Sequence, residues 1–349
     1  MLPSIRRPIV LSIVLVPFLV GCGSTTTTSP AAAASPPGSN LPGSLDDLLF
    51  TSDVYAGSPN GLLEVYSLQS AGGTPPKRLT LCNSGSTPCA SLEAASSPDK
   101  TRLAVRRVVT DTNGDGLLTA ADSSELDYVD LSQPADVVFA PTSAQVNGVD
   151  WSALDTDIVY SGAGPSGEED LFDIGTTGQS LVNLTQSLNT RERSPRFDAT
   201  GTVLVFERID AGQKGTVWIL DQNGNETEVD AGAPGLAPLP GTPYIVGGDA
   251  DPAFSPDGNS VVFRRLTGIG NGGLGTWDLV VTNGTTATTV VTGPLYRGAP
   301  DWGPNGIVFV ETDALGRSSL VVVAQDGSGR RAVFSPPAGF TVASPRWLP

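Results

Sequence analysis

The feature that most constrains this chain is a short unit that recurs about every fifty residues. In its clearest copy, at 251–265, a Phe leads into the turn Ser-Pro-Asp-Gly and an apolar run leads out, in the letters DPAFSPDGNSVVFRR. A tight turn between two such runs predicts a β-hairpin. Related copies lie at 93–107, 148–162, 194–208, 299–311 and, in truncated form, 343–349. Recurrence on this scale is typical of a repeat architecture.

The spacing of the copies predicts a β-propeller. One marker position per copy is a Ser, Trp or Phe, and successive markers lie 55, 46, 57, 48 and 45 residues apart, at Ser96, Trp151, Phe197, Phe254, Trp302 and Trp347. Further β-type runs follow each complete hairpin, and a four-stranded unit of this length is a propeller blade. The last copy ends after one strand, whereas residues 48–81 supply three runs. We therefore expect an all-β, six-bladed propeller at 47–349, its first blade closed by the C-terminal strand.

The amino terminus predicts export and lipid attachment. Residues 1–22 contain Arg6, Arg7 and an apolar run at 9–20 that is too short to span a bilayer comfortably, and they end in Leu-Val-Gly-Cys. That ending resembles the bacterial lipobox, which implies a signal peptide whose Cys22 becomes lipidated. The alternative is an ordinary signal peptide with a chance cysteine. Residues 23–46, rich in Ser, Thr, Pro and Ala, are expected to form a disordered tether.

The turns, the apolar runs after them and the four-strand rhythm resemble the TolB-like, WD-repeat-like six-bladed propellers of bacteria. This resemblance covers roughly residues 48–349 and implies a fold rather than a role, because propellers host many unrelated functions. The chain departs from TolB itself in carrying a lipobox and no evident separate amino-terminal α/β domain. A role in the Tol–Pal envelope system is therefore not carried over.

Composition excludes several classes of function. The net charge of −16 disfavours binding to the phosphates of nucleic acid. The chain has no histidine, which removes Ser-His-Asp and Cys-His catalysis and every histidine-containing zinc site. Cys82 and Cys89 enclose a short loop, and in an exported protein two such cysteines are expected to form a disulfide rather than remain free.

Residues 111–122, with the letters DTNGDGLLTAAD, match the calcium loop of an EF-hand. Its expected oxygen ligands for Ca²⁺ are Asp111, Asn113, Asp115, the Leu117 carbonyl, Thr119 and Asp122, and Gly116 supplies the sharp turn. Asp at the last position resembles the dockerin variant, and its shorter side chain reaches less well than Glu. The flanking runs look like strands rather than helices. The alternative is a polar hairpin loop rich in turn formers.

Blade geometry predicts one face with long loops and one with short turns. The long insertions at 82–89, 111–122, 231–249 and 268–275 fall on one set of connections, and loops on a rigid scaffold often carry function. The candidate ligand face near the channel mouth comprises Glu93, Arg191, Arg193, Asp249, Asp251, Tyr296 and Arg297. The alternative is that these side chains are solvated or satisfy strand ends. The Ser-Pro-Asp-Gly turns are interpreted as scaffold on the opposite, plain face.

The combined pattern favours a monomeric, non-catalytic binding scaffold anchored by lipid to the bacterial cell envelope, at the outer membrane on the periplasmic side or at the cell surface. Its expected partner is a protein, peptide or glycan of the envelope. One alternative is a carboxylate-based hydrolase of the glycosidase kind, which needs no histidine. Another is a purely structural component of the envelope.

Overall fold

The computed structural model describes residues 47–54, 62–82, 88–132, 136–138, 145–229, 235–237, 247–269 and 275–349. The predicted signal peptide, Cys22 and the tether lie outside these residues. The described residues form 24 β-strands and no helix, so this part of the chain is all-β as expected. It accordingly contains no helix with the length and apolar character needed to cross a membrane.

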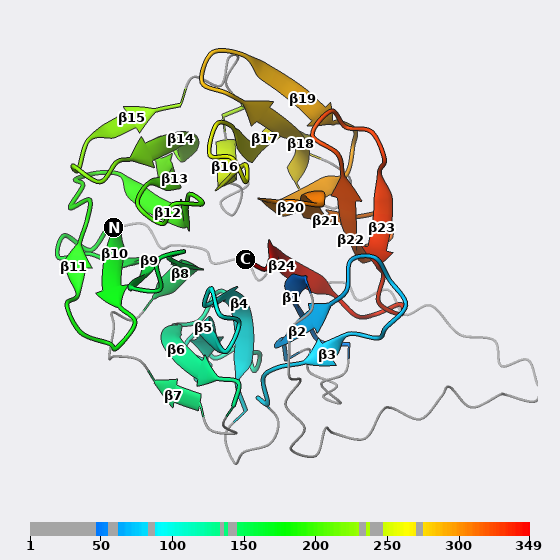
Figure 1. Cartoon of the computed structure of the whole chain (residues 1–349), viewed down its shortest axis with the longest axis horizontal. Coiled ribbons are helices and arrows are strands. Elements are labelled where there is room, and N and C mark those ends of the chain that lie inside the picture. The colour runs from blue at the N-terminus through cyan, green and yellow to red at the C-terminus, as the bar shows by residue number, and fades with distance from the viewer. Residues whose placement is uncertain are drawn as a thin grey trace, which may run out of the picture. The chain divides into compact units, whose positions relative to one another are not determined.

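The strands follow one another in groups of four (Figure 1). The first sheet, in the order β24-β1-β2-β3, contains β24 (Val342–Trp347), β1 (Leu48–Ser52), β2 (Glu64–Leu68) and β3 (Lys77–Arg78). The second contains β4 (Ala90–Ser96), β5 (Arg102–Val108), β6 (Glu125–Asp130) and β7 (Asp136–Val138). The third contains β8 (Val146–Trp151), β9 (Asp157–Ala163), β10 (Glu169–Gly175) and β11 (Val182–Asn183).

The next two groups of four join into one eight-stranded sheet. One group is β12 (Arg191–Phe197), β13 (Leu204–Ile209), β14 (Lys214–Leu220) and β15 (Glu226–Glu228). The other is β16 (Gly247–Phe254), β17 (Val261–Ile269), β18 (Gly275–Thr282) and β19 (Ala287–Val291). The last sheet contains β20 (Tyr296–Gly303), β21 (Gly306–Thr312), β22 (Ser318–Val323) and β23 (Arg331–Phe334).

A short parallel pair between β14 and β16, which the sequence did not predict, joins the two groups. Lys214 lies opposite Gly247 and Gly215 lies opposite Gly248. The two backbones approach so closely that a Cβ atom on Gly248 would lie 2.1 Å from the carbonyl oxygen of Gly215. Glycine permits this contact because it lacks a Cβ atom.

The final strand of the chain pairs with the first described strand. In the antiparallel pair of β24 and β1, Trp347 lies opposite Leu48 and Val342 lies opposite Ser52. The Leu348 N–H then donates a hydrogen bond of 3.0 Å to the Asp47 carbonyl. Segments almost 300 residues apart in sequence thus share one sheet (Figure 1).

The core lies between neighbouring sheets. Val262 of β17 packs in a cluster with Phe309 of β21, whereas the next residue, Phe263, packs in a cluster with Val205 of β13. Successive side chains of a strand point to opposite faces of its sheet, so both faces of this sheet are buried. Coverage on both faces explains why the sequence shows continuous apolar runs instead of strict alternation.

Six strands lie innermost in Figure 1, namely β4, β8, β12, β16, β20 and β24, and five of them share an irregularity close to the cavity described below. A residue three places before the aromatic marker has a positive φ of 46–72° in five of them, and the pairing register shifts there: Gly148, Ser194, Asp251, Ala299 and Ser344. Such β-bulges bend a strand and re-aim the side chains that follow. Proline follows four of these residues. Because proline has no N–H to donate, it is tolerated where the ladder of hydrogen bonds between strands is interrupted.

Candidate functional site

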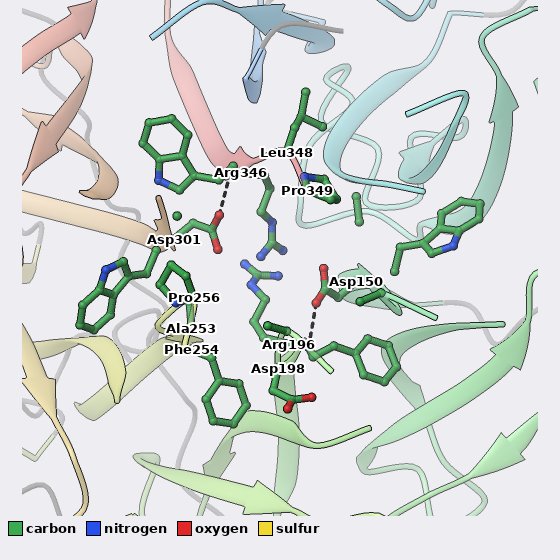
Figure 2. Close-up of a pocket in the computed structure, with 18 of the residues that line it drawn as sticks. Asp150, Arg196, Asp198, Ala253, Phe254, Pro256, Asp301, Arg346, Leu348 and Pro349 are labelled. Atoms are coloured by element: carbon green, nitrogen blue, oxygen red, sulfur yellow. Dashed lines mark hydrogen bonds between the residues drawn. The ribbon is translucent and has the colours of Figure 1, made fainter. Parts of the chain in front are cut away.

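A cavity of about 350 Å³ opens where the innermost strands end. All six innermost strands contribute the residue immediately before their marker, and these residues are Ala95, Asp150, Arg196, Ala253, Asp301 and Arg346. The order Ala, Asp, Arg repeats after three strands. Two aspartates and two arginines therefore line the cavity in a pseudo-twofold arrangement (Figure 2).

The two arginines converge on the middle of the cavity (Figure 2). Arg196 and Arg346 are only 5% and 4% exposed. Both guanidinium groups approach the carbonyl oxygen of Val149, Arg196 through Nη1 at 3.5 Å and Arg346 through Nη2 at 3.1 Å. Nε of Arg196 and both Nε and Nη1 of Arg346 are buried and have no hydrogen-bond partner among the described residues. The two side chains thus hold unused donors in a shared space.

The two aspartates beside them each accept a hydrogen bond from the backbone of the next inner strand. Asp150 Oδ2 accepts the Phe197 N–H at 2.8 Å, and Asp301 Oδ2 accepts the Trp347 N–H at 2.7 Å. Loss of solvent contact raises the pKa of Asp301 to about 6, and it raises the pKa of Asp150 in the same direction. The positive charge of Arg196 opposes both shifts.

The rest of the lining is largely apolar. Aromatic markers and proline residues of the turns form much of the wall, and they include Trp151, Phe197, Phe254, Trp302, Trp347, Pro256 and Pro304. The indole N–H of Trp347 is a further buried donor without a described partner. The site thus combines an apolar wall with a few convergent polar groups, as small-molecule and peptide sites commonly do.

The residues of the candidate ligand face bond instead to their neighbours. Arg191 and Arg193 pair with Glu169, Asp249 pairs with Arg265, Asp251 pairs with Arg264, Arg297 pairs with Glu311, and the Tyr296 ring faces Arg264. Glu93 lies 3.8 Å from Arg346 and 3.9 Å from Arg106, and its Oε2 accepts the Gly148 N–H. Glu93 therefore lies beside a residue of the cavity lining, Arg346, whereas the other side chains pair with charged or aromatic neighbours.

The cavity lies among the short turns that the sequence analysis interprets as scaffold. Parts of the long loops on the opposite connections, at 83–87, 231–234, 238–246 and 270–274, lie outside the described residues. The sequence pattern did not predict the arginine pair, because the copies resemble one another most at the aromatic marker and not at the residue before it. The position just before each marker, compared across the six copies, would have revealed the alternation of Asp and Arg.

The predicted calcium loop is folded as a series of turns. Asp111 accepts the N–H groups of Gly114 and Gly116 at 2.6 and 2.8 Å, and Asp115 accepts the Leu117 N–H at 2.8 Å. Both oxygens of Asp122 accept backbone N–H groups, including that of Thr119, which lowers the pKa of Asp122. Within the part of the chain that the structure describes, no three Asp, Glu, His or Cys side chains are grouped to hold a metal ion.

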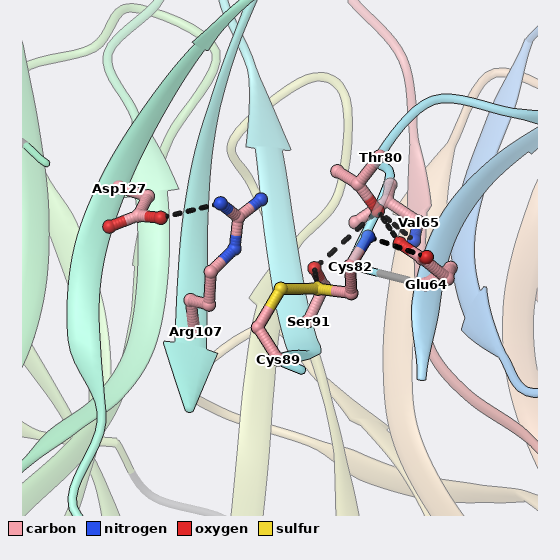
Figure 3. The surroundings of a disulfide bond; sticks show 8 residues. All are labelled: Glu64, Val65, Thr80, Cys82, Cys89, Ser91, Arg107 and Asp127. Atoms are coloured by element: carbon pink, nitrogen blue, oxygen red, sulfur yellow. Dashed lines mark hydrogen bonds and ion pairs between the residues drawn. A yellow bond between two sulfur atoms is a disulfide. The ribbon is translucent and has the colours of Figure 1, made fainter. Parts of the chain in front are cut away.

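Cys82 and Cys89, which the sequence analysis pairs, form a disulfide in the structure (Figure 3). Beside it the buried carboxylate of Glu64 accepts the Cys82 N–H at 2.7 Å and the Thr80 hydroxyl at 2.5 Å. Burial raises the pKa of Glu64 to about 7 even though these hydrogen bonds oppose the shift. The disulfide thus closes a loop directly before the inner strand β4.

Comparisons with known proteins define the fold. No protein-family model and no curated protein sequence matches the chain. TolB from Acinetobacter baumannii superposes with a TM-score of 0.61 at 19% identity, over 88% of this chain and 68% of that one. A structure assigned as TolB from Agrobacterium tumefaciens gives 0.55 at 15% identity, over 88% and 100%. A chain of a nidogen/laminin complex gives 0.57 at 10% identity, over 87% and 98%.

The stacked groups of four strands and these structural neighbours define the class of fold as a β-propeller. Within that class, the fold is similar to the two TolB structures and to the chain of the nidogen/laminin complex.

Proposed function

We propose that the protein is a membrane-anchored, extracytoplasmic binding protein whose propeller is a non-catalytic scaffold for a protein, peptide or smaller ligand. The observation that carries this proposal is the central cavity, in which two buried arginines hold unused donors between apolar walls. Convergent polar groups in a concave apolar site are the usual signature of ligand binding. The similar propeller structures include TolB and a chain of a nidogen/laminin complex, and a complex of this kind is compatible with a protein-binding role for the fold.

The proposal includes six blades and a closed ring. Six groups of four strands follow each other in sequence, and apolar clusters join each group to the next. One cluster joins β1 and β2 to β5, and another joins them to β21 and β22. With β24 paired to β1, each of the six groups in this arrangement has a neighbouring group on both sides.

The envelope location rests on the leader sequence. We propose that Cys22 carries the lipid anchor and that residues 23–46 act as the tether. Mass spectrometry of the mature protein should find an acylated amino-terminal Cys22, and Cys22→Ala should release the protein from the membrane fraction. An unmodified Cys22 in the mature protein would contradict the anchor.

We also propose that calcium orders the loop at 111–122. The donor set is chemically suitable, because carboxylate, amide and carbonyl oxygens are the ligands that Ca²⁺ prefers. An oxygen that accepts one N–H retains a second lone pair for a cation. The bound ion would stabilise the turns of this loop.

The calcium proposal predicts that Ca²⁺ raises the melting temperature of the native protein. Asp111→Ala combined with Asp115→Ala should abolish that rise. Asp221→Ala is the matched control, because Asp221 also accepts backbone N–H groups in an exposed turn but lies outside this loop. An unchanged calcium response in the double variant would disprove the proposal.

The binding function itself is tested by capture from envelope extracts. Immobilised mature protein should retain a specific partner or ligand that is lost when Arg196 and Arg346 are both replaced by glutamine. Recovery of the same molecules by the wild type and the double variant would mean that the cavity is not the binding site.

A second candidate function is a carboxylate-based hydrolase, because two carboxyl groups with raised pKa values, Asp150 and Asp301, line the same cavity. Such a pair is the catalytic requirement of many glycosidases. Both carboxylates nevertheless hold the backbone of a neighbouring strand, which favours a structural role. Turnover of aryl glycosides that disappears in Asp150→Asn and Asp301→Asn would replace the binding proposal.

A further inference from the structure

The arginine pair has more hydrogen-bond donors than the described residues have acceptors for them. Arg196 and Arg346 are more than nine-tenths buried, and three of their N–H-bearing nitrogens have no partner among the described residues. A buried guanidinium group that lacks partners is costly, and two that share one carbonyl oxygen also repel each other. An acceptor placed between the two guanidinium groups would relieve both costs.

The nearby carboxylates provide negative charge but few hydrogen-bond acceptors for the two arginines. Asp150 and Asp301 direct an oxygen to the backbone N–H of the next strand, and neither forms a salt bridge with the pair in the described part of the chain. Glu93 is 3.8 Å from Arg346 Nη2, but it also pairs with Arg106 and accepts the Gly148 N–H. Both arginine side chains line the cavity of about 350 Å³, and their guanidinium groups meet in its middle (Figure 2).

We propose that this cavity binds a carboxylate group between Arg196 and Arg346, with the apolar body of the ligand against the aromatic markers. The guanidinium group presents a planar set of donors that matches a carboxylate. Asp150 and Asp301 flank the site and oppose a ligand of higher negative charge, such as phosphate. The proposal rests on the proposed binding function and narrows it to ligands that carry a carboxylate.

The carboxylate could belong to a free organic acid or to the end of a peptide chain. Benzoate serves as the probe for a free acid, and its neutral isostere benzamide is the control. N-acetylphenylalanine serves as the probe for a peptide terminus, and its amide is the control. Each pair differs only in whether a carboxylate is present.

The experiment is calorimetric titration of the mature protein with these four probes at constant ionic strength. Benzoate or N-acetylphenylalanine should bind, and the neutral partners should not. Arg196→Gln and Arg346→Gln should each weaken binding by about tenfold to a hundredfold, since a hydrogen bond to a charged group contributes on that scale. Arg317→Gln, at an exposed ion pair away from the cavity, should leave binding unchanged.

A variant that fails to fold is recognised by its melting curve, and Arg196→Lys provides the second test. Lysine retains the positive charge but lacks the planar donor fork, so binding should be weakened while the melting temperature stays near that of the wild type. Equal binding of acid and amide, equal binding by the wild type and the Arg346→Gln variant, or binding of inorganic phosphate without either carboxylate would overturn the proposal.

The titration and the capture from envelope extracts together distinguish a failure of the carboxylate site from a failure of the proposed binding function. Binding of benzoate alone assigns the site to free acids, and binding of N-acetylphenylalanine alone assigns it to peptide termini. If neither carboxylate binds while an envelope partner is still captured, the carboxylate site is wrong and the binding function stands. If a carboxylate binds but the envelope extract yields nothing, the site stands and the proposed partner is wrong.

Discussion

The bulge residues of the innermost strands show how single positions shape the central cavity. Gly148 lies at φ 72°, and a Cβ atom added there would be 2.9 Å from the Cα of Ser194 on the next inner strand. At this position glycine therefore meets two needs, a left-handed backbone and close contact between strands. Ala299 and Ser344 adopt the same left-handed conformation despite their side chains, at φ 46° and 47°.

Gly148→Ala is expected to destabilise the protein by about 2–4 kcal/mol, because strain of the left-handed backbone is added to overpacking against Ser194. Gly224→Ala is the matched control. Gly224 also has a positive φ of 80°, but nothing lies within 4 Å of its added Cβ atom. Urea denaturation should show the larger loss for Gly148→Ala, and equal losses for the two variants would show that the close contact carries no energy.

At the scale of elements, the pairing of β24 with β1 covers one edge of β1. An uncovered strand edge invites pairing with another chain, and β24 occupies the edge of β1 and becomes the edge strand of the first sheet itself. The same strand carries Arg346 to the cavity. The pairing with β1 and the proposed site therefore depend on the same strand of six residues.

A chain that stops after Thr341 is expected to aggregate or to unfold at a clearly lower urea concentration than the full chain, since β1 loses its partner. A chain lacking only the exposed Pro349, which lies beyond β24, is the control. Light scattering after size exclusion and urea denaturation provide the measurements. If the chain ending at Thr341 remains monomeric with an unchanged midpoint, β24 does not hold the first sheet in place.

The strand pattern was largely readable from the sequence, whereas the cavity was not. The Ser-Pro-Asp-Gly turn and the run Val261-Val262-Phe263 locate a hairpin because local turn chemistry and burial on both faces act over few residues. The parallel pair of Gly215 and Gly248 depends on how two blades meet, which no local pattern encodes. The convergence of Arg196 and Arg346 likewise depends on how β12 and β24 are arranged in space, since 150 residues separate the two side chains in the sequence.

At the scale of the whole molecule, buried carboxyl groups predict an unusual pH dependence. Burial raises the pKa of Glu64 to about 7 and that of Glu207 to about 8, and desolvation also raises the pKa of Asp173 and Asp301 to about 6. Each group binds its proton more tightly in the folded chain than in the unfolded chain. Its stabilising contribution is therefore complete below the unfolded pKa and is lost as the pH rises through the folded pKa.

The free energy of unfolding should accordingly fall between about pH 5 and pH 8, above the range in which carboxyl groups with a lowered pKa such as Asp99 titrate, and each buried group contributes up to about 1.4 kcal/mol per pH unit within its own window. Glu207→Gln should reduce the slope between about pH 5 and pH 8, because this group has the highest of the raised carboxyl pKa values. A stability that rises with pH over this interval would contradict the assignment.

Photo-crosslinking in cells tests whether the turn-side cavity of the propeller is a binding site. A photoreactive residue placed at Ala199, on the cavity lining, reports contacts at the arginine pair, and one at Leu315, 76% exposed on the opposite set of connections, reports the other face. Our account predicts a discrete crosslinked product from position 199 that disappears when Arg196 and Arg346 are replaced by glutamine. A product formed only from position 315, or one that persists in the double variant, would contradict it.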